Sequence, residues 1–144
     1  MVGGKECDQT VYEIAREVGR LIAKAGAILI CGGRGGVMEA ACLGAVEEKG
    51  LTIGILPSAD IKEANQYVRI PIATGMGMGR NVIIAQTAQA FIAVDGQYGT
   101  LSEIAFALQL RKPVICLQPW IIVPGVQVVK SAQEAVDVAI RCCV

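Results

Sequence analysis

The sequence predicts an α/β protein in which a parallel sheet is covered by helices on both faces. Short apolar segments of strand length alternate with segments of helical period along the 144 residues. The strand segments are apolar throughout, which is typical of parallel strands buried on both sides. Glycine-rich turns follow three of these strands, and in such sheets ligands bind beyond the carboxyl ends of the strands.

The composition indicates a single domain over residues 1–144. Apolar residues make up 53% of the chain, the mean hydropathy is +0.53, and only 18% of the residues are charged. A chain of this length buries about two thirds of its unfolded surface, and the apolar excess predicts a homodimer or homotetramer. The longest uncharged stretch contains prolines and the N-terminus lacks a secretory pattern, so we expect a cytoplasmic protein with no membrane partner.

The charge balance and the residue types exclude several functions. Lysine and arginine together number 13, as do aspartate and glutamate, and the basic residues are scattered. We therefore predict no nucleic-acid partner. Histidine is absent, which excludes a Ser-His-Asp triad and an HExxH zinc site, and the six cysteines include no CxxC pair. We predict no metal site and a reducing environment.

Each element follows from a local pattern. Residues 8–25 carry apolar side chains at intervals of three and four, with Asp8 or Thr10 as a cap and Gly26 as a stop. Pro71 indicates the end of a strand or an edge strand. We expect further helices at residues 37–49, 82–89, 101–110 and from Ser131 to about 141. We expect strands at residues 27–30, 51–56, 67–72, 90–94 and 113–117, and one more within 120–129.

The first glycine turn, CGGRGGVMEAA at residues 31–41, has the composition of a phosphate site. Glycines allow positive φ and close approach of a ligand. The first N–H groups of the following helix have no intrahelical partner, and the helix dipole favours an anion. Glycines also serve tight turns without any ligand, so a structural role stays open. The candidate binding residues are Gly32, Gly33, Arg34, Gly35, Gly36, Val37 and Met38.

Two further glycine turns precede helices. Residues 75–81, GMGMGRN, and residues 95–100, DGQYGT, repeat the combination of a flexible loop and a helix start. Neither GxGxxG nor GxxxxGK[ST] is present, which disfavours classical NAD binding and Walker-type ATP hydrolysis. Arg80 is either a phosphate clamp or an exposed side chain, and Glu103 either takes part in chemistry or complements the helix dipole. The candidate binding residues are Gly79, Arg80, Asn81, Gly96, Gly99 and Thr100.

Three motifs, CGGRGGVMEAA, GRN at 79–81 and DGQYGTLSE at 95–103, together resemble the lysine-decarboxylase-like group of Rossmann proteins. That group includes the LONELY GUY phosphoribohydrolases and the molybdenum cofactor carrier proteins. The resemblance covers nearly the whole chain and implies a three-layer Rossmann-like fold and a homo-oligomer. Relatives begin with an apolar strand before a Gly-Gly turn, whereas only Met1 and Val2 precede Gly3 and Gly4. We therefore predict a truncated first strand, either because native residues are missing or because the sheet tolerates a stub.

The resemblance implies that Arg80 and Glu103 are catalytic if the protein is an enzyme. In the LONELY GUY pattern PGGxGTxEE, the residues that match are Gly96, Gly99, Thr100 and Glu103. Departures from the patterns of these enzymes weaken the enzyme hypothesis, and the short chain and the style of the first motif are more similar to the carrier branch. The departing residues are Cys31, Glu39, Asn81, Asp95, Gln97 and Ser102.

The leading hypothesis is a binding or carrier protein for a phosphate-bearing small molecule, either a nucleotide or a pterin such as the molybdenum cofactor. It requires no cofactor of its own; the candidate bound molecules are a nucleotide, phosphate or the molybdenum cofactor. The alternative is a phosphoribohydrolase that releases a base from a nucleoside 5′-monophosphate, with Glu103 acting on the ribose or water and Arg80 holding the substrate. A scaffold with a vestigial site is the third hypothesis.

Overall fold

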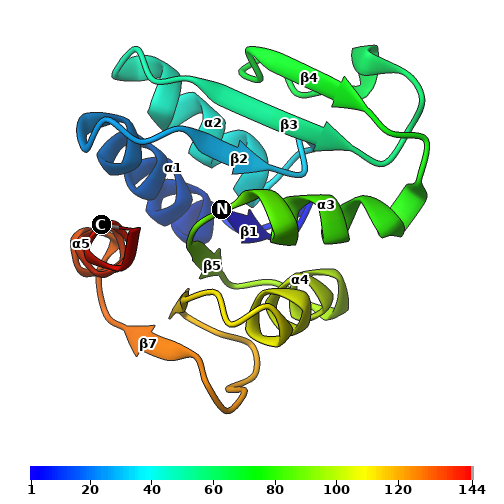
Figure 1. Cartoon of the computed structure of the whole chain (residues 1–144). Helices are drawn as coiled ribbons and strands as arrows, with labels where there is room; N and C mark the ends of the chain where they lie inside the picture. Colours follow the sequence, from blue (N-terminus) through cyan, green and yellow to red (C-terminus); the bar gives the residue numbers. More distant parts are fainter. Residues whose placement is uncertain (144) are drawn as a thin grey trace.

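The computed structural model describes residues 1–143 and alternates parallel strands with helices (Figure 1). The order of strands and helices predicted from the sequence is confirmed. The strands are β1 (Val2–Gly3), β2 (Leu29–Cys31), β3 (Thr52–Leu56), β4 (Ile70–Ala73), β5 (Phe91–Val94), β6 (Val114–Leu117) and β7 (Gln127–Val129). The helices are α1 (Gln9–Lys24), α2 (Val37–Glu47), α3 (Arg80–Thr87), α4 (Tyr98–Gln109) and α5 (Ala132–Cys143), with short 3-10 helices η1 (Ile61–Glu63) and η2 (Gly77–Gly79).

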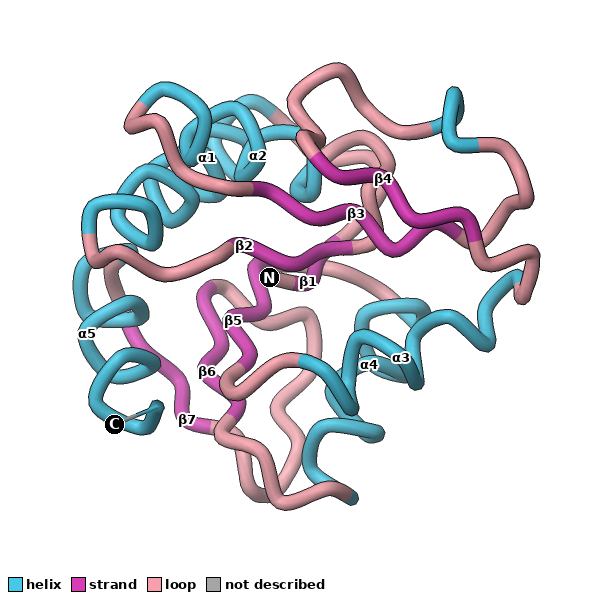
Figure 2. The backbone as a smooth tube through the Cα atoms, turned by 45° about the horizontal axis from the view of Figure 1, so that its top comes forward, coloured by secondary structure: helices cyan, strands magenta, loops and turns pink. Residues whose placement is uncertain are grey.

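Helices cover both faces of the strands (Figure 2). Helices α1, α2 and α5 pack together over one face, and α3 and α4 over the other, each with its own apolar core. Helices α1 and α2 can lie close together because Gly19 and Gly44 have no Cβ. A Cβ on Gly19 would clash with the backbone of Ala41, and one on Gly44 with the backbone of Arg16. The predicted three-layer Rossmann-like arrangement is confirmed. None of the helices within residues 1–143 is both long and apolar enough to cross a membrane.

The strands form two parallel sheets, and the gap between the sheets lies between β1 and β2. One sheet has the order β1-β5-β6-β7 and the other β2-β3-β4. Strand β1 has two residues and pairs with β5 only at Ala93 and Val94. On the other side of β1, the terminal ammonium of Met1 donates a hydrogen bond to the carbonyl of Ile30 at 2.9 Å. The short first strand agrees with the prediction, and it leaves most of β2 and β5 without a strand between them.

Side-chain caps account for the starts of two helices, and a proline marks an edge strand. Asp8 is the cap of α1, because the Val11 N–H donates to its Oδ1 at 2.8 Å. Before α5, the Glu134 N–H donates to Ser131 Oγ at 3.1 Å, and the Glu134 carboxylate accepts from the Lys130 N–H at 3.0 Å. Pro71 lies in β4, which is an edge strand as predicted.

Candidate functional site

A cavity of about 320 Å³ lies at the carboxyl ends of β1 and β5. This is the edge at which open parallel sheets bind ligands. Its walls come from the turn after β1, the starts of α2 and α3, and the turn between β5 and α4. The lining residues are Gly3, Gly4, Lys5, Glu6, Met38, Arg80, Asn81, Asp95, Gly96, Gln97, Gly99, Thr100 and Glu103.

The first turn of α4 forms one wall of the cavity. Gln97, which precedes the helix, makes no side-chain capping hydrogen bond, and no acidic residue lies in the first turn. Gly96 has a φ of 110°, and a Cβ there would clash with the side chain of Thr100. At Gly99 an added Cβ would meet nothing within 4 Å, so that part of the turn faces open space. Free N–H groups and the helix dipole together make this turn suited to an anion.

Glu103, one turn further along α4, places a buried carboxyl group in the cavity wall. Its side chain is 6% exposed, and within the described chain no side chain forms a hydrogen bond or ion pair with it. Burial raises the pKa of Glu103 to about 7, while the positive charges of Arg80 and of the N-terminal ammonium oppose that rise. At neutral pH both protonation forms are therefore populated, so the group can donate or accept a hydrogen bond.

Arg80 joins the start of α3 to the ends of two strands. Its Nη1 donates to the carbonyl of Gly32 at 2.5 Å and to that of Ile55 at 2.6 Å. A Cβ on Gly32 would clash with the guanidinium, so this glycine is what allows the approach. The buried Nε has no partner, and burial lowers the pKa of Arg80. Arg80 thus supplies a fixed positive charge to the cavity wall, and its partly buried guanidinium is not the exposed side chain that was the alternative to a phosphate clamp.

Asn81 connects the start of α3 to the first turn of α4. Its Nδ2 donates to Ser102 Oγ at 3.1 Å, and that hydroxyl donates to the carbonyl of Gly99 at 2.7 Å. The Oδ1 of Asn81 is buried and has no partner. Buried polar atoms in proteins are nearly always hydrogen-bonded. Asn81 Oδ1, the Glu103 carboxyl group and Arg80 Nε therefore equip this cavity for a polar ligand.

The first glycine turn packs against the turn after β1. The Val37 N–H donates to the carbonyl of Gly4 at 2.9 Å, and Gly36, with a φ of 62°, is too close to the backbone of Gly4 and Lys5 for any Cβ. Arg34 is paired with Glu63 at 3.1 Å. The contacts of Gly36 and Val37 hold the two turns together, and that of Arg34 ties the first glycine turn to η1. Most of the first glycine turn therefore does not line the cavity.

The cavity wall includes about half of the site residues that were predicted from the sequence. It includes Met38, Arg80, Asn81, Gly96, Gly99, Thr100 and Glu103. The wall does not include Gly32, Gly33, Arg34, Gly35, Gly36, Val37 or Gly79. It also contains residues that the sequence did not nominate, namely Gly3, Gly4, Lys5, Glu6, Asp95 and Gln97. Gly3 and Gly4 follow a strand as the other glycine turns do, and that signal was available in the sequence.

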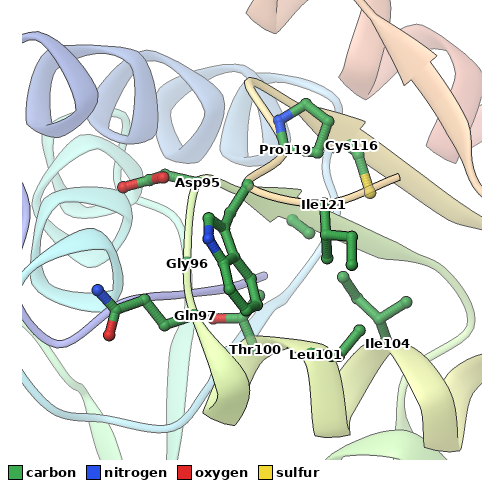
Figure 3. Close-up of a pocket in the computed structure, with 11 residues that line it drawn as sticks. Asp95, Gly96, Gln97, Thr100, Leu101, Ile104, Cys116, Pro119 and Ile121 are labelled. Atoms are coloured by element: carbon green, nitrogen blue, oxygen red, sulfur yellow. The ribbon is translucent and has the colours of Figure 1, made fainter. Parts of the chain in front are cut away.

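A small pocket of about 10 Å³ adjoins the cavity and shares Asp95, Gly96, Gln97 and Thr100 with it. In Figure 3, Pro119 and Ile121 of the loop after β6 lie across this pocket from α4. Trp120 of the same loop lines it too. The indole ring of Trp120 meets the ring of Tyr98 edge to face, with centroids 5.0 Å apart and an interplanar angle of 76°.

Comparison with known proteins adds a family and solved relatives. Residues 1–141 match the model described as the SLOG cluster4 family. A protein of Archaeoglobus fulgidus is 47% identical over 141 residues, which cover 97% of this chain and 92% of that protein.

Two solved structures with similar folds are named for the molybdenum cofactor. The molybdenum cofactor binding protein of Rippkaea orientalis has a TM-score of 0.90 and 36% identity, with 96% of this chain and 91% of that one covered. A structure of the molybdenum cofactor carrier protein of Chlamydomonas reinhardtii has a TM-score of 0.85 and 33% identity, with 98% and 93% covered. The resemblance that the three motifs indicated is confirmed.

Proposed function

The chain belongs to the SLOG cluster4 family, and we propose that it is a binding or carrier protein for a phosphate-bearing small molecule. The molybdenum cofactor is the first candidate cargo, because two similar structures are of proteins that bind or carry it. A nucleotide is the second candidate. The observation that supports the proposal most directly is the cavity of about 320 Å³, with its uncapped helix start and its unpartnered buried polar atoms.

The phosphate of the cargo would lie against the first turn of α4. That turn offers free N–H groups, the positive end of the helix dipole and no competing carboxylate within the turn. Arg80 adds a positive charge that is already held in place by two carbonyl groups. Fixed donors lose little conformational entropy when they bind a ligand, which favours affinity.

The remaining polar groups of the wall would bind the rest of the molecule. Asn81 Oδ1 and the Glu103 carboxyl group can accept hydrogen bonds from the N–H or O–H groups of a pterin or a ribose. The cavity volume lies at the lower end of the range of roughly 300 to 1,000 Å³ that is usual for small-molecule sites. A cavity of this size suits a single small-molecule ligand.

The proposal is tested by loading the protein with cargo. Molybdenum cofactor released anaerobically from a molybdoenzyme is mixed with the protein, and the mixture is passed through a gel-filtration column. We expect molybdenum and pterin to elute with the protein at about one per chain. Arg34→Ala should retain as much, because Arg34 pairs with Glu63 and does not line the cavity. The absence of both molybdenum and pterin from the protein fraction contradicts a role in carrying this cofactor.

A phosphoribohydrolase is the second candidate, and the buried Glu103 favours it. A carboxyl group with a pKa of about 7 is suited to proton transfer near neutral pH, and it lines the same cavity as Arg80. We nevertheless expect no free base to be released from adenosine 5′-monophosphate. Turnover that is lost in Glu103→Gln while binding survives would assign the protein to the hydrolases.

We also propose that the protein is a homodimer or homotetramer. Several large apolar side chains are exposed, including Ile72, Met78 and Ile122, and clusters of such side chains often mark protein contacts. Light scattering at micromolar concentration should return a multiple of the chain mass of 15.1 kDa. A monomer mass contradicts this proposal and leaves the binding function unaffected.

A further inference from the structure

Two exposed aromatic side chains lie next to the candidate site. Tyr98 is 75% exposed and Trp120 is 48% exposed. Aromatic residues make up only 4% of the chain and Trp120 is its one tryptophan, so their exposure as a contacting pair is not a consequence of aromatic abundance. The edge-to-face contact holds the two rings at a defined angle. We call Tyr98 and Trp120 together the aromatic pair.

The aromatic pair adjoins residues of the cavity wall, although neither Tyr98 nor Trp120 lines the cavity itself. Tyr98 is the first residue of α4 and stands between Gln97 and Gly99, both of which line the cavity. Trp120 lines the small pocket that shares Asp95, Gly96, Gln97 and Thr100 with the cavity. Tyr98 thus belongs to the helix turn against which the phosphate is proposed to lie, and its ring contacts Trp120.

Packing alone explains only part of this arrangement. Trp120 lines the small pocket together with apolar residues of α4, Leu101 and Ile104, so part of the indole faces a hydrophobic environment. It does not account for Tyr98, three quarters of whose surface is in solvent. The adjoining cavity independently indicates a ligand, because its wall holds the buried Glu103 carboxyl group without a partner.

We propose that the aromatic pair is a stacking subsite for a flat heteroaromatic ring, a nucleobase or a pterin, carried by the same phosphate-bearing ligand. This inference rests on the proposed function, since the ring and the phosphate belong to one molecule. Stacking on aromatic side chains accepts any flat base, because each has a π-face. The aromatic pair thus selects ring-bearing phosphates over phosphates that lack a ring.

The test uses the fluorescence of Trp120, which reports on the subsite without a label. The protein is titrated with guanosine 5′-monophosphate, with adenosine 5′-monophosphate and with ribose 5-phosphate, and the affinities are also measured by calorimetry. We expect both nucleotides to quench the fluorescence and to bind at least about tenfold more tightly than ribose 5-phosphate, the scale of base stacking. Ribose 5-phosphate should bind with little quenching.

Variants separate stacking from packing. Tyr98→Ala and Trp120→Ala should bring the affinities for the nucleotides close to that for ribose 5-phosphate, while the latter stays unchanged. Trp120→Phe keeps a ring and should restore part of the preference, which a loss of fold in Trp120→Ala would not explain. Ile122→Ala, at a position 70% exposed and two residues along the same loop, should keep the full preference.

The outcomes distinguish the subsite from the function. If ribose 5-phosphate binds as tightly as the nucleotides, the stacking subsite is wrong and phosphate binding stands. If none of the three phosphates binds, both the stacking subsite and nucleotide binding are wrong. The loading experiment with the molybdenum cofactor then tests the proposed function separately. If Trp120→Ala changes the mass found by light scattering and leaves the preference intact, the aromatic pair serves a subunit contact and the inference is overturned.

Discussion

Two cavities lie at opposite ends of the strands, and they differ in what lines them. The cavity at the carboxyl ends has about 320 Å³ and contains Glu103 and the unpartnered oxygen of Asn81. The cavity at the amino ends is larger, about 380 Å³, and lies between β2 and β5 among mainly apolar side chains such as Ile22, Ile53 and Ile140. Size therefore does not identify the candidate site; unpartnered buried polar atoms do.

The amino-end cavity has a structural origin. Strand β1 pairs with β5 only through Val2 and Gly3, so the amino-terminal parts of β2 and β5 have no strand between them. The ammonium of Met1 borders this space, and burial lowers its pKa. Substitutions at the two ends should therefore have different consequences. Those at the carboxyl end should change binding and pH dependence, and those at the amino end should change only stability.

The largest effect is expected at Arg80. Arg80→Ala removes a charged donor from two carbonyl groups, and hydrogen bonds to charged groups contribute about 1.5 to 3 kcal/mol each. We expect the free energy of unfolding in urea to fall by about 3 kcal/mol or more. Arg34→Ala is the control, because its half-exposed pair with Glu63 should contribute less than about 1 kcal/mol. Equal losses in the two variants would contradict the bracing role of Arg80.

The next effect is the pH dependence that Glu103 imposes. Its pKa rises from 4.5 to about 7 on folding, so the folded state holds this proton more tightly than the unfolded state. Stability is then highest below pH 4.5, falls as the pH rises from 4.5 to 7, and is level above 7. Between pH 5 and pH 8 this contribution is about 2 kcal/mol.

Glu103→Gln should remove that contribution. Urea unfolding of the variant and of the unaltered protein at both pH values measures the difference, and the variant should gain relative stability at pH 8. An identical pH dependence in the two proteins would mean that Glu103 does not titrate as its burial implies.

The sequence was sufficient for the alternation of elements, and it predicted a site at the edge of the sheet where the polar cavity lies. Glycine turns and uniformly apolar strands are local signals, and they grouped Gly96, Gly99, Thr100 and Glu103, all of which line the cavity. Contacts between distant residues carry no such signal. The carbonyl partners of Arg80 lie 48 and 25 residues away in the chain.

Two contacts at the first glycine turn could not be predicted from the sequence, for the same reason. Arg34 stands among glycines, and its partner Glu63 of η1 lies 29 residues away. Val37 donates its N–H to the carbonyl of Gly4, which lies in a distant turn of the chain. The turn after β1 reaches the cavity through the same kind of long-range contact, because it packs against the first glycine turn.

The smallest effect is expected at the amino-end cavity. Ala27 lines it, and Ala27→Leu should fill part of the space and raise the free energy of unfolding by about 1 kcal/mol. Ligand affinity and the pH dependence should not change. Ala105→Leu, at an exposed position of α4, is the control and should alter stability by less than about 0.5 kcal/mol. A loss of cargo binding in Ala27→Leu would show that the two ends are coupled.

The central claim is that the first turn of α4 binds the phosphate of the cargo, and Gly99 tests it most directly. A Cβ added at Gly99 meets no atom within 4 Å, and an acidic residue in the first turn of a helix favours the fold. Gly99→Asp therefore keeps the structure and adds a negative charge where the phosphate is proposed to lie, whereas Gly99→Asn adds the same shape without the charge.

The measurement is the molybdenum cofactor retained by each variant after gel filtration. We predict at least about tenfold less cofactor on Gly99→Asp than on Gly99→Asn, since repulsion of like charges at contact costs about 1 to 4 kcal/mol. Equal retention by the two variants would contradict the claim.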